Sequence, residues 1–215
     1  MKDRGLIFNG EMVRAILDGR KTQTRRIMKN QPAGDFPQTP ALIRNVVGAG
    51  FQWYGHYGES GIFNCPFGAV GDRIWVRETW AEAGAGAPEL KLYRADYPDH
   101  VPSHYENVPP ASDIRWTPSI HMPRNASRIL LEITGVRVER LNSISQEDAQ
   151  AEGMELTGWR PTYSDPDSGG EVWTPYDNFA QLWESIYGEE SWKANPWVWV
   201  IEFKVVPNVQ DNPEG

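Results

Sequence analysis

Alternating and continuous apolar segments predict the strands of a sheet. Residues 128–141 alternate apolar and polar side chains around Gly135, and residues 197–206 form a strongly apolar final strand. A period of two is typical of β-structure. The glycine inside the first segment indicates a bulge or a sharp bend, as barrels need at their corners. Shorter strands are expected at residues 5–8, 21–28, 73–80 and 90–95.

Helical spacing appears in three places. Residues 11–18 and 176–187 place apolar side chains three and four positions apart, which predicts amphipathic helices. Residues Ser145–Asp148 resemble a capping box in an aspartate-containing form, so a third helix is expected over 146–152. A glycine directly follows the first and the third of these segments and is expected to end each helix.

Between these elements lie three long stretches with little periodicity. They are rich in Gly, Pro and aromatic residues and are interpreted as insertions at about residues 30–69, 81–123 and 156–175. No repeat or second-domain boundary is visible, so residues 1–207 are expected to form a single domain. Residues 208–215 are polar and are expected to be a disordered tail. The whole predicts an α+β fold, with two to three helices flanking a small β-barrel.

The charge of the chain is unevenly distributed. The net charge of −8 argues against broad binding to nucleic acid. Residues 1–30, however, hold eight basic and three acidic side chains, a net +5, so the remainder carries −13. A cationic patch on an acidic body indicates one anionic or polar ligand held in one place.

Several classes of site are not indicated. The sequence has no phosphate-binding glycine loop, no dinucleotide fingerprint and no nucleophile elbow. His100 and His104 are four residues apart, but Pro102 between them opposes a helix, so no metal and no cofactor are expected. No apolar run approaches the roughly 18 residues of a membrane helix. The single cysteine, Cys65, excludes an internal disulfide and favours a reducing, cytoplasmic setting.

The segment Gly19–Arg26 gathers the most chemistry. It supplies hydroxyl groups, an amine and guanidinium groups that bind carbonyl or phosphate oxygens. In a regular strand Thr22 and Thr24 face one way and Lys21 the other, so Lys21 reaches Thr24 only if the backbone turns. The alternative is a solvated basic hairpin edge, since clustered charges usually face water.

The order of four motifs resembles the ASCH domain, a PUA-like β-barrel. The motifs are LDGRKTQTR at 17–25, VGDRIWV at 70–76, ISQEDAQAEGM at 144–154 and VWVIEFK at 198–204. Each motif is weak alone, and the combination is specific. The three insertions go beyond the minimal domain and resemble the larger, phage- or prophage-encoded members, which implies the cytoplasm of a bacterial host.

The resemblance implies an RNA- or nucleobase-directed function. A small bacterial branch of the family consists of amidohydrolases that remove the acetyl group of N4-acetylcytidine with a Thr, a Lys and a Glu. By motif match these residues are Thr24 as nucleophile, Lys21 as base and Glu152 as acid. A Thr hydroxyl needs a base to take its proton, and a Lys is a base only if its pKa is lowered. The ligand-binding residues expected beside them are Arg20, Thr22, Arg25, Arg26 and Trp75.

Other functions remain open from the sequence. One alternative is a non-catalytic module that binds RNA or a modified nucleotide, and another is a ribonuclease acting on single-stranded RNA. A third is a phage accessory protein whose barrel only carries protein contacts. Trp75, Trp80, Trp116 and Trp159 are candidates for stacking on a base, and packing of loops onto the core is the alternative role for each. The expected ligand is a nucleoside or single-stranded RNA, and no membrane contact is expected.

Overall fold

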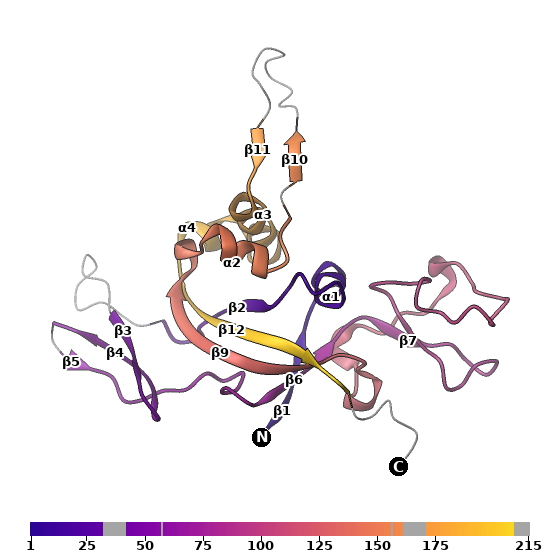
Figure 1. Cartoon of the computed structure of the whole chain (residues 1–215), viewed down its shortest axis with the longest axis horizontal. Helices are drawn as coiled ribbons and strands as arrows, with labels where there is room; N and C mark the ends of the chain where they lie inside the picture. The colour runs from indigo at the N-terminus through magenta and orange to yellow at the C-terminus, as the bar shows by residue number, and fades with distance from the viewer. Residues whose placement is uncertain (32–41, 57, 156, 161–170, 209–215) are drawn as a thin grey trace.

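The most apolar segments of the chain pair at the centre of the main sheet. The computed structural model describes residues 1–31, 42–56, 58–155, 157–160 and 171–208. The main sheet is formed by strands β1 (Asp3–Ile7), β6 (Arg73–Arg77), β9 (Leu130–Arg140), β12 (Trp197–Val206) and β2 (Gln23–Ile27), in that order across the sheet. The pair β1–β6 is parallel, and the other neighbours are antiparallel. Strands β9 and β12 run side by side through a long bend (Figure 1).

The remaining elements surround this sheet. Its helices are α1 (Gly10–Leu17), α2 (Gln146–Ala151), α3 (Pro175–Tyr187) and α4 (Glu189–Lys193). A three-stranded sheet consists of β3 (Leu42–Val46), β4 (Gly50–Gly55) and β5 (Gly58–Glu59). Two further pairs of strands are β7 (Trp80–Glu82) with β8 (Lys91–Tyr93) and β10 (Thr157–Arg160) with β11 (Glu171–Trp173). Short 3-10 turns occupy Ala111–Asp113, Ser119–His121, Arg124–Ala126 and Leu141–Ser143. The α+β class is therefore confirmed.

The strand order leaves the main sheet open. Its outer strands are β1 and β2, so within the described residues the sheet does not close into the expected barrel. The bulge expected near Gly135 is confirmed: Glu202 pairs with Gly135 and Phe203 with Ile133, which leaves Thr134 without a partner on β12. The extra residue bends β9 at this point.

Strand β12 is buried on both faces, which explains its nearly continuous apolar sequence. Trp199, Ile201 and Phe203 pack into a core with α1 and the β3–β5 sheet. Val198 and Val200, on the other face, pack against α2 and α3. Helix α3 begins with a complete capping box in which Thr174 and Asp177 bond each other's backbone N–H groups. The sheet thus has helices at both of its faces.

The expected insertions differ in character. Residues 42–46, 50–55 and 58–59, expected to be irregular, form the three-stranded β3–β5 sheet. Residues 96–123 form two 3-10 turns and one isolated β-bridge, between Thr117 and Trp80, and no longer helix or strand, as the six prolines predict. Residues 157–160 and 171–173 pair as the hairpin β10–β11, which projects away from the helices in Figure 1. Residues 32–41, 161–170 and 209–215, the last within the expected disordered tail, lie outside the described residues.

A buried ion cluster fastens the 81–123 segment to the main sheet. Arg128 forms two hydrogen bonds of 3.0 Å each to the Glu78 carboxylate and two of 2.7 and 2.8 Å to the Asp96 carboxylate. Its guanidinium also lies 4.1 Å from the centre of the Tyr93 ring. Burial raises the pKa of Glu78 despite the Arg128 contact, so that carboxylate depends on its partner.

Replacement of Arg128 tests this cluster. Arg128→Met leaves the Glu78 carboxylate buried and unpaired, and we expect the free energy of unfolding to fall by about 3–5 kcal/mol. Urea denaturation measures the loss. Arg115→Met, which changes an exposed arginine of the same segment, should cost less than about 0.5 kcal/mol. Equal losses in the two variants would contradict a role for Arg128 in fastening the segment.

Candidate functional site

The Gly19–Arg26 segment lies between the end of α1 and the end of α2. Gly19 adopts a φ of 75°, which allows the chain to reverse after the helix. The Lys21 N–H then donates to the Ala15 carbonyl (2.9 Å) and the Thr22 N–H to the Ala151 carbonyl (2.8 Å). Lys21 and Glu152 also form an isolated β-bridge. Backbone contacts therefore bring Lys21 and Glu152 together before any side chain is considered.

The side chains of Lys21 and Glu152 form a buried ion pair. The Lys21 Nζ donates to Glu152 Oε2 at 2.5 Å and to the Glu152 carbonyl at 2.9 Å. The two side chains are 0% and 3% exposed. The other carboxylate oxygen, Glu152 Oε1, accepts from Arg25 at 3.2 Å, and the Arg25 side chain is also fully buried. The alternative of a solvent-facing basic edge is therefore wrong for this part of the segment.

Burial changes the acidity of the Lys21 ammonium. Loss of solvation lowers its pKa from the ordinary value, and the positive charges of Arg26 and Arg25 act in the same direction. Glu152 acts in the opposite direction and does not cancel the effect. A lowered pKa makes the neutral amine, the form that accepts a proton, more accessible near neutral pH.

The ion pair belongs to a larger network on one face of β2. Arg25 also donates to Asp148 (2.8 Å) and Glu139 (3.2 Å), and Arg137 donates to Asp148 at 2.7 Å. Gln23 donates to the Asp148 carbonyl at 2.6 Å. Burial opposes ionisation of Asp148, but Arg137 and Arg25 lower its pKa overall. Lys21, Gln23 and Arg25 thus share a face, as strand alternation predicts.

Thr24 and Glu152 line the same cavity. Its volume is about 160 Å³, and Arg25 and Arg26 contribute to its wall. The other lining residues are mainly apolar and come from β1, the β1–α1 connection, α1 and α3: Ile7, Asn9, Met12, Phe179, Leu182, Trp183, Ile186 and Tyr187. Lys21 does not line this cavity, and it contacts the cavity wall through its bond to Glu152. Glu152 is therefore the residue that links the buried amine to the cavity that Thr24 also lines.

A second hollow adjoins the first. It has a volume of about 360 Å³ and shares Met12, Glu152 and Leu182 with the first cavity. Arg20 lies in its wall, where it donates to the Gly153 carbonyl (2.9 Å) and pairs with Asp18 (2.9 Å). The two hollows together form a cleft with Glu152 at their junction.

The other predicted ligand-binding residues take different places. Arg26 donates to the Ile7 carbonyl at 2.7 Å, and its guanidinium lies 5.3 Å from the centre of the Phe8 ring. Thr22 is exposed and lines neither hollow. Trp75 lies on β6, where the Arg77 guanidinium carbon is 5.4 Å from the centre of the Trp75 ring. Trp75 also lines neither hollow. The structure thus brings Arg20, Arg25 and Arg26 to the cleft, but not Thr22 or Trp75.

Sequence reasoning did not identify two parts of the site. The acidic partners Asp148 and Glu139, together with Arg137, lie on α2 and β9, far from residues 19–26 in sequence. The apolar wall of the cavity comes from α3, through Phe179 and Trp183. The helical spacing of α3 predicted an apolar face, but nothing in the sequence indicated which residues that face covers.

Comparisons with protein-family models, curated proteins and solved structures find no match. The chemistry of the site is therefore inferred from its geometry and from the motif resemblance. Among the described residues, no three or more His, Cys, Asp or Glu side chains are grouped as metal ligands. No described helix combines the length and the apolar character that crossing a membrane requires.

Gly153 permits the close approach between the two halves of the site. Its φ is 96°, and a Cβ at this position would lie 2.8 Å from the Ala15 Cβ and 3.3 Å from the Lys21 Cβ. A side chain there would both strain the backbone and push α1 and Lys21 away from Glu152.

Two glycine variants separate these effects. Gly71 has a φ of 87° and open space around its Cα, so Gly71→Ala should cost about 1–2 kcal/mol from backbone strain alone. Gly153→Ala should cost roughly 1–3 kcal/mol more because of overpacking. Urea denaturation of both variants measures the difference. Equal losses would show that the contact between Gly153 and α1 is not tight.

Proposed function

We propose that the protein is a hydrolase that removes an acyl group from the exocyclic amine of a nucleobase, as in N4-acetylcytidine. The observation that carries the proposal is the shared cavity of Thr24 and Glu152, with the buried Lys21 amine bonded to the same carboxylate. A hydroxyl, a carboxylate and an amine of lowered pKa are the groups that nucleophilic amide hydrolysis requires. These groups come from segments about 130 residues apart.

In the proposed reaction Thr24 attacks the acyl carbonyl carbon. The hydroxyl proton passes to Lys21 by way of the Glu152 carboxylate, and a new C–O bond forms. The proton then returns from the Lys21 ammonium to Glu152, which delivers it to the exocyclic nitrogen while the C–N bond breaks and the free amine leaves. Water hydrolyses the acyl ester on Thr24, so that the products are the nucleoside and the carboxylic acid. Arg25 holds Glu152 in position through its hydrogen bond to Oε1.

The shape of the cleft supports a nucleoside as ligand. The cavity beside Thr24 has the aromatic walls Phe179, Trp183 and Tyr187, which suit a flat base. The adjoining hollow with Arg20 has room and hydrogen-bonding capacity for a sugar. Glu152 at the junction would then lie next to the exocyclic amine.

The sheet supports a relationship to the ASCH and PUA-like folds. Strands β9 and β12 bend strongly, and α1 connects the two outer strands β1 and β2 (Figure 1). We propose that this bent sheet corresponds to the barrel of those folds in an open form. The bulge at Thr134 supplies part of the required curvature.

Replacement of Thr24 tests the catalytic proposal. Thr24→Ala removes the nucleophile, and we expect acetate release from N4-acetylcytidine to fall by at least about a thousandfold. Thr22→Ala is the matched control, because Thr22 is two residues away on an exposed position outside both hollows.

In the wild type, kcat should rise with pH through an inflection below the ordinary pKa of lysine, since the neutral amine is the active form.

Two outcomes would contradict the proposed hydrolase or the role of Thr24 in it. Wild-type protein without turnover on N4-acetylcytidine and related acylated nucleosides would overturn the proposal. Equal activity of Thr24→Ala and Thr22→Ala would remove Thr24 from the mechanism. Thermal unfolding of each variant confirms that a loss of activity does not reflect a loss of fold.

A second candidate function is binding of RNA or a modified nucleotide without chemistry. The observation that favours it is the position of Lys21, which lines neither hollow and is fully engaged with Glu152. In this function the Lys21–Glu152 pair only holds the cleft together. Arg20 and Arg26, which border the cleft, would contact the ligand.

Binding is tested with arginines of the cleft wall. Arg25 is unsuitable, because its removal would leave Glu152 and Asp148 with fewer partners inside the protein. Arg20→Gln with Arg26→Gln should weaken binding of a short single-stranded RNA and reduce the slope of log K against log salt by about 1–2. Arg44→Gln, which changes an arginine paired with Glu59, is the control. Unchanged affinity in the double variant would contradict the binding function.

A further inference from the structure

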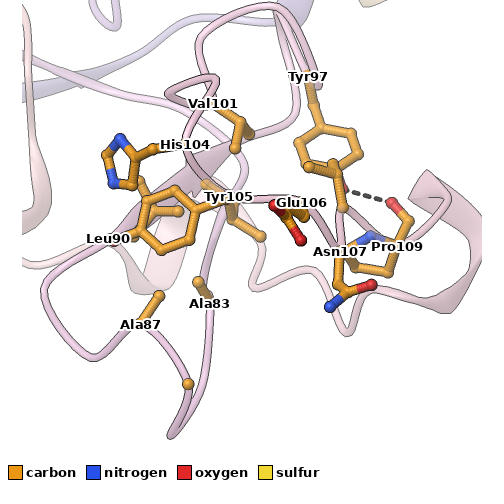
Figure 2. A pocket seen from close by; sticks show the side chains of 13 residues that line it. Ala83, Ala87, Leu90, Tyr97, Val101, His104, Tyr105, Glu106, Asn107 and Pro109 are labelled. Carbon is orange, nitrogen blue, oxygen red and sulfur yellow. Dashed lines mark hydrogen bonds between the residues drawn. The ribbon is translucent and has the colours of Figure 1, made fainter.

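A separate hollow lies in the 81–123 segment. It has a volume of about 420 Å³ and is formed by the β7–β8 connection and the loop that follows β8 (Figure 2). This volume falls in the range of about 300–1,000 Å³ that is typical of small-ligand sites. None of its lining residues belongs to the cleft at Glu152. The hollow is therefore a second candidate site with its own chemistry.

Two tyrosine rings form much of its wall. The Tyr97 hydroxyl donates to the Pro109 carbonyl. The Trp116 and Tyr97 rings pack edge to face, with their centres 5.6 Å apart. The Tyr105 N–H donates to the Pro102 carbonyl at 3.1 Å, which fixes the backbone there, and the centre of the Tyr105 ring lies 4.3 Å from that of the His104 ring. The Tyr97 ring, held at its hydroxyl, loses little conformational freedom when a ligand binds, which favours recognition of a flat group.

Glu106 gives the hollow a negative charge. Apart from His104, it is the only ionisable lining residue besides the tyrosines, and neither Lys nor Arg lines the hollow. Figure 2 shows its carboxylate between the Tyr105 and Tyr97 side chains. Within the described part of the chain, the Glu106 carboxylate has no ion-pair or hydrogen-bond partner. Its hydrogen-bonding capacity is therefore available to a ligand.

We propose that this hollow binds a guanidinium group. A guanidinium is planar, stacks on aromatic faces and forms paired hydrogen bonds with a carboxylate. The tyrosine rings supply the faces, and Glu106 supplies the carboxylate. The group belongs either to a free small molecule or to an arginine side chain of a protein partner. This site goes beyond the proposed hydrolase function and does not depend on it.

Three probes distinguish these sources. Agmatine represents a free guanidinium compound, and N-acetyl-arginine amide represents an arginine within a peptide. N-acetyl-citrulline amide has the same shape as the second probe but carries a neutral urea. Calorimetry and NMR titration of the full chain should detect binding of at least one guanidinium probe and no binding of the citrulline compound at the same concentration.

Two variants locate the binding. Glu106→Gln keeps the size of the side chain and removes its charge, so the affinity of the guanidinium probe should fall at least about tenfold. Glu89→Gln, which changes a carboxylate of the same segment outside the hollow, should leave the affinity unchanged. Binding of N-acetyl-arginine amide alone would assign the site to a protein partner. Absence of binding by both guanidinium probes, equal binding of the citrulline compound, or unchanged affinity in Glu106→Gln would overturn the proposal.

Discussion

The contact between Lys21 and Glu152 is the constraint on which the rest of the site depends. Removing two charges from water costs several kcal/mol for each ion, and only close pairing with additional hydrogen bonds offsets that cost. The chain provides these bonds through the Glu152 carbonyl and through Arg25. The end of α2 must therefore lie against the start of β2, and this placement puts Glu152 in the wall of the cavity that contains Thr24.

Burial of this contact also determines what the cleft can do chemically. A solvent-exposed lysine remains a cation at neutral pH, whereas desolvation lowers the pKa of Lys21. The same burial keeps the amine away from ligands, since the Lys21 side chain is fully buried and lines neither hollow. Catalysis and simple binding differ in whether a proton crosses this carboxylate. The two proposed functions thus share one architecture.

Sequence patterns predicted the helices and strands whose formation depends on interactions between residues close together in the chain. The strand β12, the three longer helices and the bulge in β9 followed from periodicity, capping residues and one glycine. The β3–β5 sheet did not, because Leu42–Val46 leaves every one of its side chains partly or fully exposed and shows no clear alternation. Burial of Lys21 was equally invisible, since its partner lies 131 residues away. The motif resemblance grouped Lys21, Thr24 and Glu152, and their catalytic roles remain predictions.

The pairing of β2 has a consequence for how the protein is made. Within the main sheet, β2 hydrogen-bonds only to β12, so residues near position 25 acquire their neighbours from residues near position 200. During synthesis on the ribosome, the Lys21–Thr24 segment must wait until residues near position 200 have been made before its strand has a partner. Such long-range pairing slows folding. Nascent chains that end before β12 would carry an incomplete cleft, so they would have neither a functioning site nor a protected sheet edge.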